Sequence, residues 1–198
     1  MGGLFASLGR TVSAGVVLLI VIVMGASAVT GQSIKVDHAY ATVIMRWLHV
    51  VCGIMWIGLL WYLSFVQMPT LPKVEPVESR IAITRFIAPA VMWWLRYAAL
   101  ATVVTGLLLA TMNKYVVQAL TLRPGFIMIG TGMWMALVMA LVVWFIVWPS
   151  QRKVLGLIEA TAEEKAAAAS RVFYGSRFNT LFSIGMLYCM VAQQNAPL

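Results

Sequence analysis

The amino-acid sequence predicts an all-α integral membrane protein with five transmembrane helices, four of which form a core bundle while the N-terminal one is an anchor. Three observations predict this fold. Of the 198 residues, 62% are hydrophobic and only 10% are charged, whereas about 25% are charged in a typical soluble domain. The apolar residues form five runs, each long enough to cross a hydrocarbon core of about 30 Å. Basic residues flank these runs, as topology signals do.

Each of the five runs is predicted to be a separate transmembrane helix. Their approximate bounds are Val12–Val29, Thr42–Val66, Ile87–Thr111, Phe126–Trp148 and Val172–Ala192. The first run follows Arg10 and ends near Ala26-Ser27-Ala28, a pattern typical of a signal peptide, and we expect it to be retained as an anchor. Residues 1–41 are therefore predicted to form an anchor helix with an outer loop, and residues 42–198 a four-helix membrane bundle.

The distribution of lysine and arginine predicts how the chain is oriented. With a cytoplasmic N-terminus, ten of the 14 basic residues fall on the inner side of the membrane and four on the outer side. An excess of basic residues marks cytoplasmic loops, so we expect a multi-pass protein of a bacterial inner membrane with a periplasmic C-terminus. The formal charge of +8 is spread over these flanks, so nucleic acid is not an expected partner. The expected partners are membrane lipids and other membrane protein subunits.

Small residues recur every four positions in two of the runs, which favours close helix packing. They are Ala98, Thr102, Gly106 and Ala110 in the third run, and Gly132, Ala136 and Ala140 in the fourth. Such ladders let helix backbones approach closely in lipid, so the bundle should be compact.

Prolines and a capping pattern predict where helices begin and end. We expect Pro89 in the first turn of its helix and Pro149 at the end of the preceding one. Thr161 and Glu164 form a capping-box pattern, and a short surface helix is predicted over about Thr161–Val172.

His49 is the leading candidate for chemistry because an ionisable residue within an apolar run is costly in lipid. His49, Gly53 and Trp56 share one helix face. A neutral imidazole is a good axial ligand for haem iron, Gly53 would leave room for a flat macrocycle, and Trp56 would stack on it. The alternative is a histidine that only joins neighbouring helices, and spacing alone favours this alternative. His38 would lie about 16 Å away along a helix, so one metal cannot be held by both.

Arg96 follows Trp93-Trp94, just inside the third run. A guanidinium at this position suits a carboxylate, a phosphate or an anionic substrate. An arginine that extends to the membrane interface beside an aromatic belt explains the same pattern equally well.

The start of the fifth run is unusually polar. Arg177 and Asn179 are candidate polar or anion contacts, and Asn179 shares a helix face with Ser183. Hydrogen bonding between helices is the interpretation that we prefer for these residues.

Several kinds of chemistry are not indicated. The sequence has no nucleophile–base pair, no glycine-rich phosphate loop and no clustered carboxylates, so no catalytic residue is predicted. All six acidic residues fall in predicted loops, which argues against a self-contained proton pump. Cys52 and Cys189 lie in apolar runs and are interpreted as small buried hydrophobes. No Cys-x-x-Cys-His motif is present, which excludes covalent c-type haem.

Three stretches resemble one family, in the family's order. They are Arg46-Trp47-Leu48-His49 with Gly53-Ile54-Met55-Trp56-Ile57-Gly58, then Trp93-Trp94-Leu95-Arg96-Tyr97-Ala98, then Ser176-Arg177-Phe178-Asn179-Thr180. Together they resemble the N-terminal membrane domain of bacterial membrane-anchored urate oxidases (urate hydroxylases), over about Thr42–Asn195. Longer family members carry a cytochrome c domain that this sequence lacks. The family's last helix tends to end in Asn-His, where Gln193-Gln194-Asn195 stands here.

The resemblance implies a redox setting, and three functions follow in order of preference. The first is a non-catalytic accessory subunit of a larger redox or respiratory complex. The second is a haem-b membrane protein that uses His49 and passes electrons between a quinone and a partner. His49 and Trp56 also look like the first helix of haem-binding four-helix membrane proteins, such as the bacterial protoporphyrinogen oxidase and copper-resistance D groups. The third is a urate-oxidising enzyme.

Overall fold

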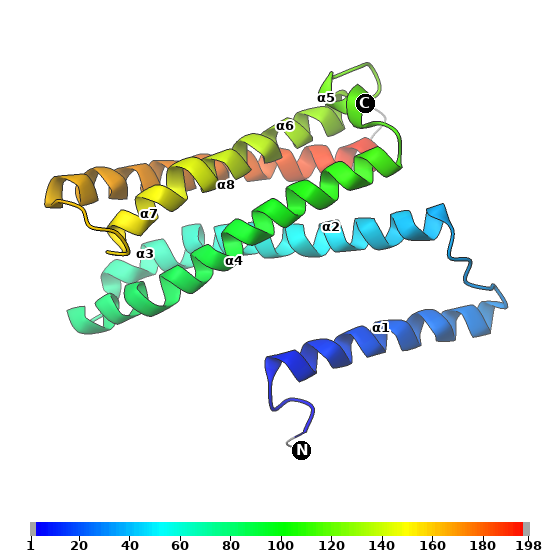
Figure 1. Cartoon of the computed structure of the whole chain (residues 1–198), viewed down its shortest axis with the longest axis horizontal. Helices are drawn as coiled ribbons and strands as arrows, with labels where there is room; N and C mark the ends of the chain where they lie inside the picture. Colours follow the sequence, from blue (N-terminus) through cyan, green and yellow to red (C-terminus); the bar gives the residue numbers. More distant parts are fainter. Residues whose placement is uncertain (1–2, 196–198) are drawn as a thin grey trace. The chain divides into compact units, whose positions relative to one another are not determined.

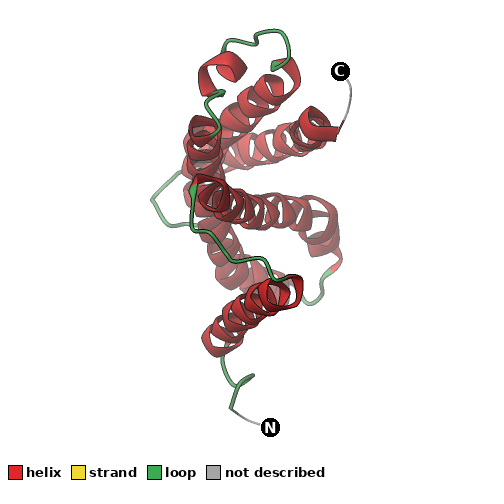
Figure 2. Ribbon diagram, turned by 90° about the vertical axis from the view of Figure 1, so that its right-hand side faces the viewer, coloured by secondary structure: helices red, strands yellow, loops and turns green. Residues whose placement is uncertain are grey.

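The computed structural model describes residues 3–195, and every regular element in that range is a helix. Figure 2 shows only helices and loops in the part that is drawn. Four of the described helical stretches are long and apolar enough to cross a membrane: Leu8–Thr30, His38–Lys73, Val77–Met112 and Ile127–Val154. The predicted all-α fold is therefore confirmed, and these four stretches are candidate membrane spans. The fifth predicted run lies in a helix that is not one of these four.

The chain divides into two compact units, Met1–Ala41 and Thr42–Leu198. The long helix of the first unit is α1 (Leu8–Thr30), which begins after Ser7, whose side chain accepts a hydrogen bond from the Arg10 backbone N–H. It ends at Gly31, whose φ of 68° is the left-handed conformation that commonly closes helices. No residue of α1 is buried, and α1 is long and apolar enough to be a candidate membrane span.

Four long helical stretches make up the second unit. The first is α2 (His38–Trp61), the π-helix η1 (Tyr62–Gln67), α3 (Met68–Thr70) and the 3₁₀ turn η2 (Leu71–Lys73), and the second is α4 (Val77–Met112). The third is α6 (Ile127–Leu141), the π-helix η3 (Val142–Val147) and α7 (Trp148–Val154), preceded by the short α5 (Val116–Leu120), and the fourth is α8 (Ala162–Asn195). In Figure 1, α6 and α7 run alongside α8, and α4 crosses α2.

The two prolines expected at helix ends lie inside helices, so both predictions were wrong. Pro89 is an interior residue because α4 begins at Val77, and the helix that contains Pro149 continues to Val154. A proline lacks an N–H and crowds the carbonyl of the preceding turn. Each π-helix ends two residues before a proline, η1 before Pro69 and η3 before Pro149. The wider π turn accommodates this local disruption, and the helix continues beyond it.

The predicted short surface helix is also not separate, because α8 is one helix of 34 residues. The predicted capping box is present at its start: the Glu164 N–H donates to Thr161 Oγ1 at 3.2 Å and the Thr161 N–H donates to Glu164 Oε2 at 3.2 Å. The hydrogen bond from Thr161 and the nearby Lys153 ammonium lower the pKa of the Glu164 carboxyl. Four consecutive alanines then favour helix, and the helix continues into the apolar run.

Close packing of α6 on α8 fixes one side of the bundle. A Cβ added to Gly132 would lie 3.0 Å from the Cβ of Cys189, which is tighter than most real contacts, so this approach favours a glycine. Cys189 is buried and Cys52 is half-buried, and both are free thiols. The main buried apolar cluster includes Trp56 and Leu60 from α2, together with Met139 of α6.

The exposure of side chains along α8 is the reverse of that in a soluble helix. Its buried residues include the polar Ser176, Asn179, Thr180 and Ser183. Several large apolar side chains point outward, with exposed fractions of 69% for Leu181, 62% for Ile184 and 62% for Val191. These four polar residues therefore face the bundle, while apolar side chains lie exposed on the same part of the helix.

Candidate functional site

A cavity of about 610 Å³ lies between α2, α4, α6 and α8. Most of its lining is apolar, and its polar lining groups include His49, Trp56, Thr102 and Tyr115. Cavities that hold small molecules or cofactors usually measure about 300–1,000 Å³ and are mainly apolar with a few polar groups. The bundle therefore has space for a flat ligand of cofactor size beside His49.

His49 contributes an imidazole whose protonation is set by its neighbours. Its Nδ1 lies 3.0 Å from the Thr102 carbonyl oxygen and 3.2 Å from Thr105 Oγ1. A carbonyl oxygen only accepts, so Nδ1 carries the proton and Nε2 carries the lone pair. The Thr105 hydroxyl donates to the Ala101 carbonyl at 2.6 Å, which leaves its oxygen to accept. A histidine whose second nitrogen is held by a backbone carbonyl is typical of metal sites.

Gly106 provides the surface on which the imidazole lies. A Cβ added there would come within 2.8 Å of His49 Cε1 and 3.2 Å of its Nδ1. Any side chain at this position would therefore displace the ring. Gly53 has more room, because an added Cβ would meet Thr102 Cγ2 at 3.9 Å, an ordinary contact, and Gly53 itself lines the cavity.

Trp56 is the third member of the predicted His49 face. Its side chain is fully buried and lines the cavity, and its indole Nε1 has no hydrogen-bond partner within the described residues. A buried N–H without an acceptor is costly and uncommon. The structure thus brings His49, Gly53 and Trp56 to one cavity, with an indole donor that a ligand would satisfy.

Other lining residues were not predicted as site residues. Tyr115 follows α4 and its ring stacks on Phe126, with 5.9 Å between the centroids. Burial raises the pKa of the Tyr115 phenol, while the positive charge of Arg46 lowers it. Arg46 lines the same cavity. No spacing in the sequence relates Tyr115 to Arg46, because they come from different helical stretches.

Three methionines also line this cavity: Met133, Met186 and Met190. In the sequence they lie among apolar neighbours, and no functional role is predicted for them. The i, i+4 spacing of Met186 and Met190 was the one signal that both face the same side.

Arg96 lies apart from the His49 cavity, among aromatic rings. It is 8% exposed, and its Cζ lies 3.9 Å from the Trp148 ring centroid, 4.8 Å from that of Tyr97 and 5.2 Å from that of Trp144. Its Nε has no hydrogen-bond partner in residues 3–195. Cation–π attraction to these rings partly replaces the hydration that burial removes.

Arg177 and Asn179 do not line the His49 cavity either. Arg177 is exposed, and its Cζ lies 5.4 Å from the Phe173 ring centroid. Asn179 is fully buried, and its Nδ2 donates to the Met139 carbonyl at 3.1 Å. Neighbouring residues of α8 make similar bonds, since Trp61 Nε1 donates to Ser183 Oγ at 2.9 Å. The polar start of the fifth run thus joins α8 to α6 and α2.

Gln193 was noted only as a departure from the family's Asn-His ending, yet it has a clear structural role. Its Oε1 accepts from the Ile129 N–H at 3.1 Å and its Nε2 donates to the Gly125 carbonyl at 2.9 Å. It therefore caps the start of α6. The side chains of Gln194 and Asn195 lie outside the described part of the chain. Within that part, no group of three or more His, Cys, Asp or Glu residues is placed to hold a metal ion.

Comparison of the chain with protein-family models, curated proteins and solved structures found no match. The resemblance to the urate oxidase membrane domain therefore depends on the three sequence stretches alone. The His49 cavity is therefore the structural feature that indicates a function.

Replacement of Gly106 by alanine should destabilise the bundle, because the new methyl group would overlap the His49 ring. Overpacking typically costs about 1–3 kcal/mol, and we expect a clear drop in the melting temperature in detergent. Gly58→Ala is the matched control, since an added Cβ there meets nothing within 4 Å. An equal effect of the two substitutions would contradict the contact between Gly106 and His49.

Proposed function

We propose that the protein is a multi-pass subunit of a bacterial inner-membrane redox complex and that it binds haem b through His49. One observation carries this proposal. The Thr102 carbonyl accepts a hydrogen bond from the Nδ1–H of His49, which leaves the lone pair on Nε2. His49 lines a cavity of about 610 Å³. This tautomer suits iron coordination by Nε2.

The residues around the cavity fit a haem. The lining is mainly apolar, Gly53 adds no side chain to it, and the buried Trp56 N–H lacks a partner within the described residues. Arg46 and Tyr115 supply polar groups suited to propionates. Met133, Met186 and Met190 line the same cavity, and one of them would supply a thioether ligand to the haem iron. When bound, haem b supplies one-electron transfer, and these side chains hold it and exclude water.

The alternative is the accessory subunit without a cofactor, in which His49 only joins α2 to α4. The two hydrogen bonds of Nδ1 to α4 favour this alternative. Urate oxidation is a third hypothesis, which comes from the sequence resemblance alone. A urate turnover assay on the purified protein tests it.

The membrane topology is part of the proposal. We propose five spans, with α1 as the anchor and α8 as the last span, because Leu181, Ile184 and Val191 of α8 are exposed while its polar Ser176, Asn179, Thr180 and Ser183 are buried. Such a helix fits a lipid-facing position despite its modest hydropathy. The lysine and arginine bias favours a cytoplasmic N-terminus and a periplasmic C-terminus.

The haem hypothesis predicts an absorbance that depends on His49. Protein purified from native membranes should show a Soret band, and His49→Ala should lose it. His38→Ala is the matched control, since His38 is the other histidine of the chain, and it should keep the band. The measurement is an absorbance spectrum with haem quantified per protein.

Two outcomes would contradict this hypothesis. Wild-type protein without stoichiometric haem would favour the accessory subunit, and His49→Ala would then cost only about 1 kcal/mol or less, the usual size of a membrane hydrogen bond. A haem that survives His49→Ala would place the ligand on another residue.

The proposed topology predicts the location of a reporter fused after Leu198. An odd number of spans brings the C-terminus to the side opposite the N-terminus, so alkaline phosphatase at this position should be active and a cytoplasmic reporter inactive. The reverse pattern would show that one of the five helices, with α8 the first suspect, does not cross the membrane.

A further inference from the structure

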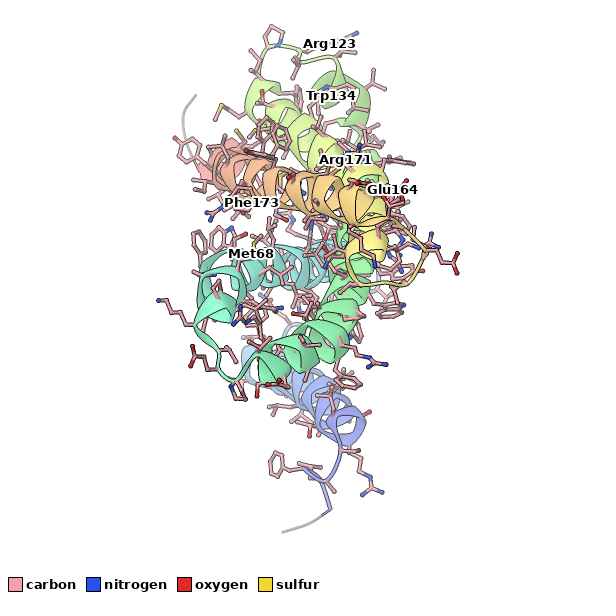
Figure 3. All side chains as sticks on the ribbon, turned by 90° about the vertical axis from the view of Figure 1, so that its left-hand side faces the viewer. Met68, Arg123, Trp134, Glu164, Arg171 and Phe173 are labelled. Atoms are coloured by element: carbon pink, nitrogen blue, oxygen red, sulfur yellow. The ribbon has the colours of Figure 1, made fainter. Side chains whose placement is uncertain are left out.

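A second cavity of about 540 Å³ lies at the other end of the bundle, beside η1–α3 and α7. Figure 3 labels two residues that line it, Met68 of α3 and Phe173 of α8. It is distinct from the His49 cavity, and the two have no lining residue in common. No Lys, Arg, His, Asp or Glu lines it, so it suits an uncharged ligand.

Two glutamines give this cavity its polar character. Gln67 and Gln151 both line it, and in each the Oε1 atom is buried without a hydrogen-bond partner in residues 3–195. Buried amide oxygens without a donor are uncommon, because each loses its hydrogen bonds to water without replacement. Two such atoms in one cavity indicate a ligand that supplies hydrogen-bond donors.

The two π-helices explain how both glutamines come to line this cavity. Gln67 is the last residue of η1, and Gln151 lies four residues after the end of η3. A π turn rotates the following helix relative to the preceding one, and π segments are frequent at functional sites. The helix disruptions near Pro69 and Pro149 therefore help to determine the direction in which the helix turns Gln67 and Gln151.

We propose that this cavity binds the head group of a membrane quinol. A quinol is uncharged and flat, and it carries two hydroxyl donors on opposite sides of its ring, which match two separate acceptors. An amide group suits both oxidation states, because Oε1 accepts from a quinol hydroxyl and Nε2 donates to a quinone carbonyl. Gln67 lies about 30 Å along the helix from Arg46, near the opposite membrane interface.

Competition against photolabelling tests this assignment. The full chain in lipid nanodiscs is irradiated with an azide-bearing short-tail benzoquinone, and decylubiquinol is added as competitor. Labelled peptides are then identified by mass spectrometry. We expect saturable labelling of peptides from η1–α3 and η3–α7. Gln67→Met and Gln151→Met keep the side-chain shape but remove the amide, and each should weaken competition about tenfold, as loss of one ordinary hydrogen bond would.

Gln118→Met is the matched control, because Gln118 of α5 lines neither cavity, and competition should be unchanged. Labelling that is not saturable, an unchanged affinity in both cavity variants, or a tightly bound phospholipid in the cavity would overturn the proposal. The haem measurement is independent of this one. Saturable quinol binding without a Soret band would reject only the haem, and a Soret band without quinol binding would reject only this site.

Discussion

Both the packing of α2 on α4 and the chemistry of the His49 cavity depend on the hydrogen bond from His49 Nδ1 to the Thr102 carbonyl. An imidazole within an apolar helix needs a partner that does not come from water, and a carbonyl of α4 provides it at 3.0 Å. This contact is possible only because Gly106 presents no side chain to the ring. It joins α2 to α4, and it assigns the proton to Nδ1, so one contact serves both helix packing and the chemistry of the cavity.

The same constraint explains the polar face of α8. Asn179 donates to the Met139 carbonyl, three residues before η3 begins, and Ser64 of η1 lies 2.7 Å from the Thr180 hydroxyl. Polar side chains of one helix thus lie against the two places where neighbouring helices depart from α geometry. This polar layer lies between the His49 cavity and the glutamine cavity.

The sequence predicted the all-helical fold, the membrane class and the face shared by His49, Gly53 and Trp56, because composition and helical periodicity are local properties. It misplaced Pro89 and Pro149, since whether a helix continues past a proline depends on its neighbours. It did not relate Gln67 to Gln151 or Arg46 to Tyr115, because packing between separate helical stretches brings the members of each pair to the same cavity. It also could not assign Gly106, whose role depends on a ring from another helix.

The protonation state of the His49 imidazole is the most direct test of the hydrogen bond from Nδ1 to the Thr102 carbonyl. In a His38→Gln background His49 is the one remaining histidine, so nitrogen-15 labelling of histidine gives an NMR spectrum of a single imidazole. We expect a proton on Nδ1, hydrogen-bonded to a carbonyl, and a lone pair or a coordinated metal on Nε2. A neutral ring protonated on Nε2 would contradict it, because Thr102 would then face a nitrogen that cannot donate.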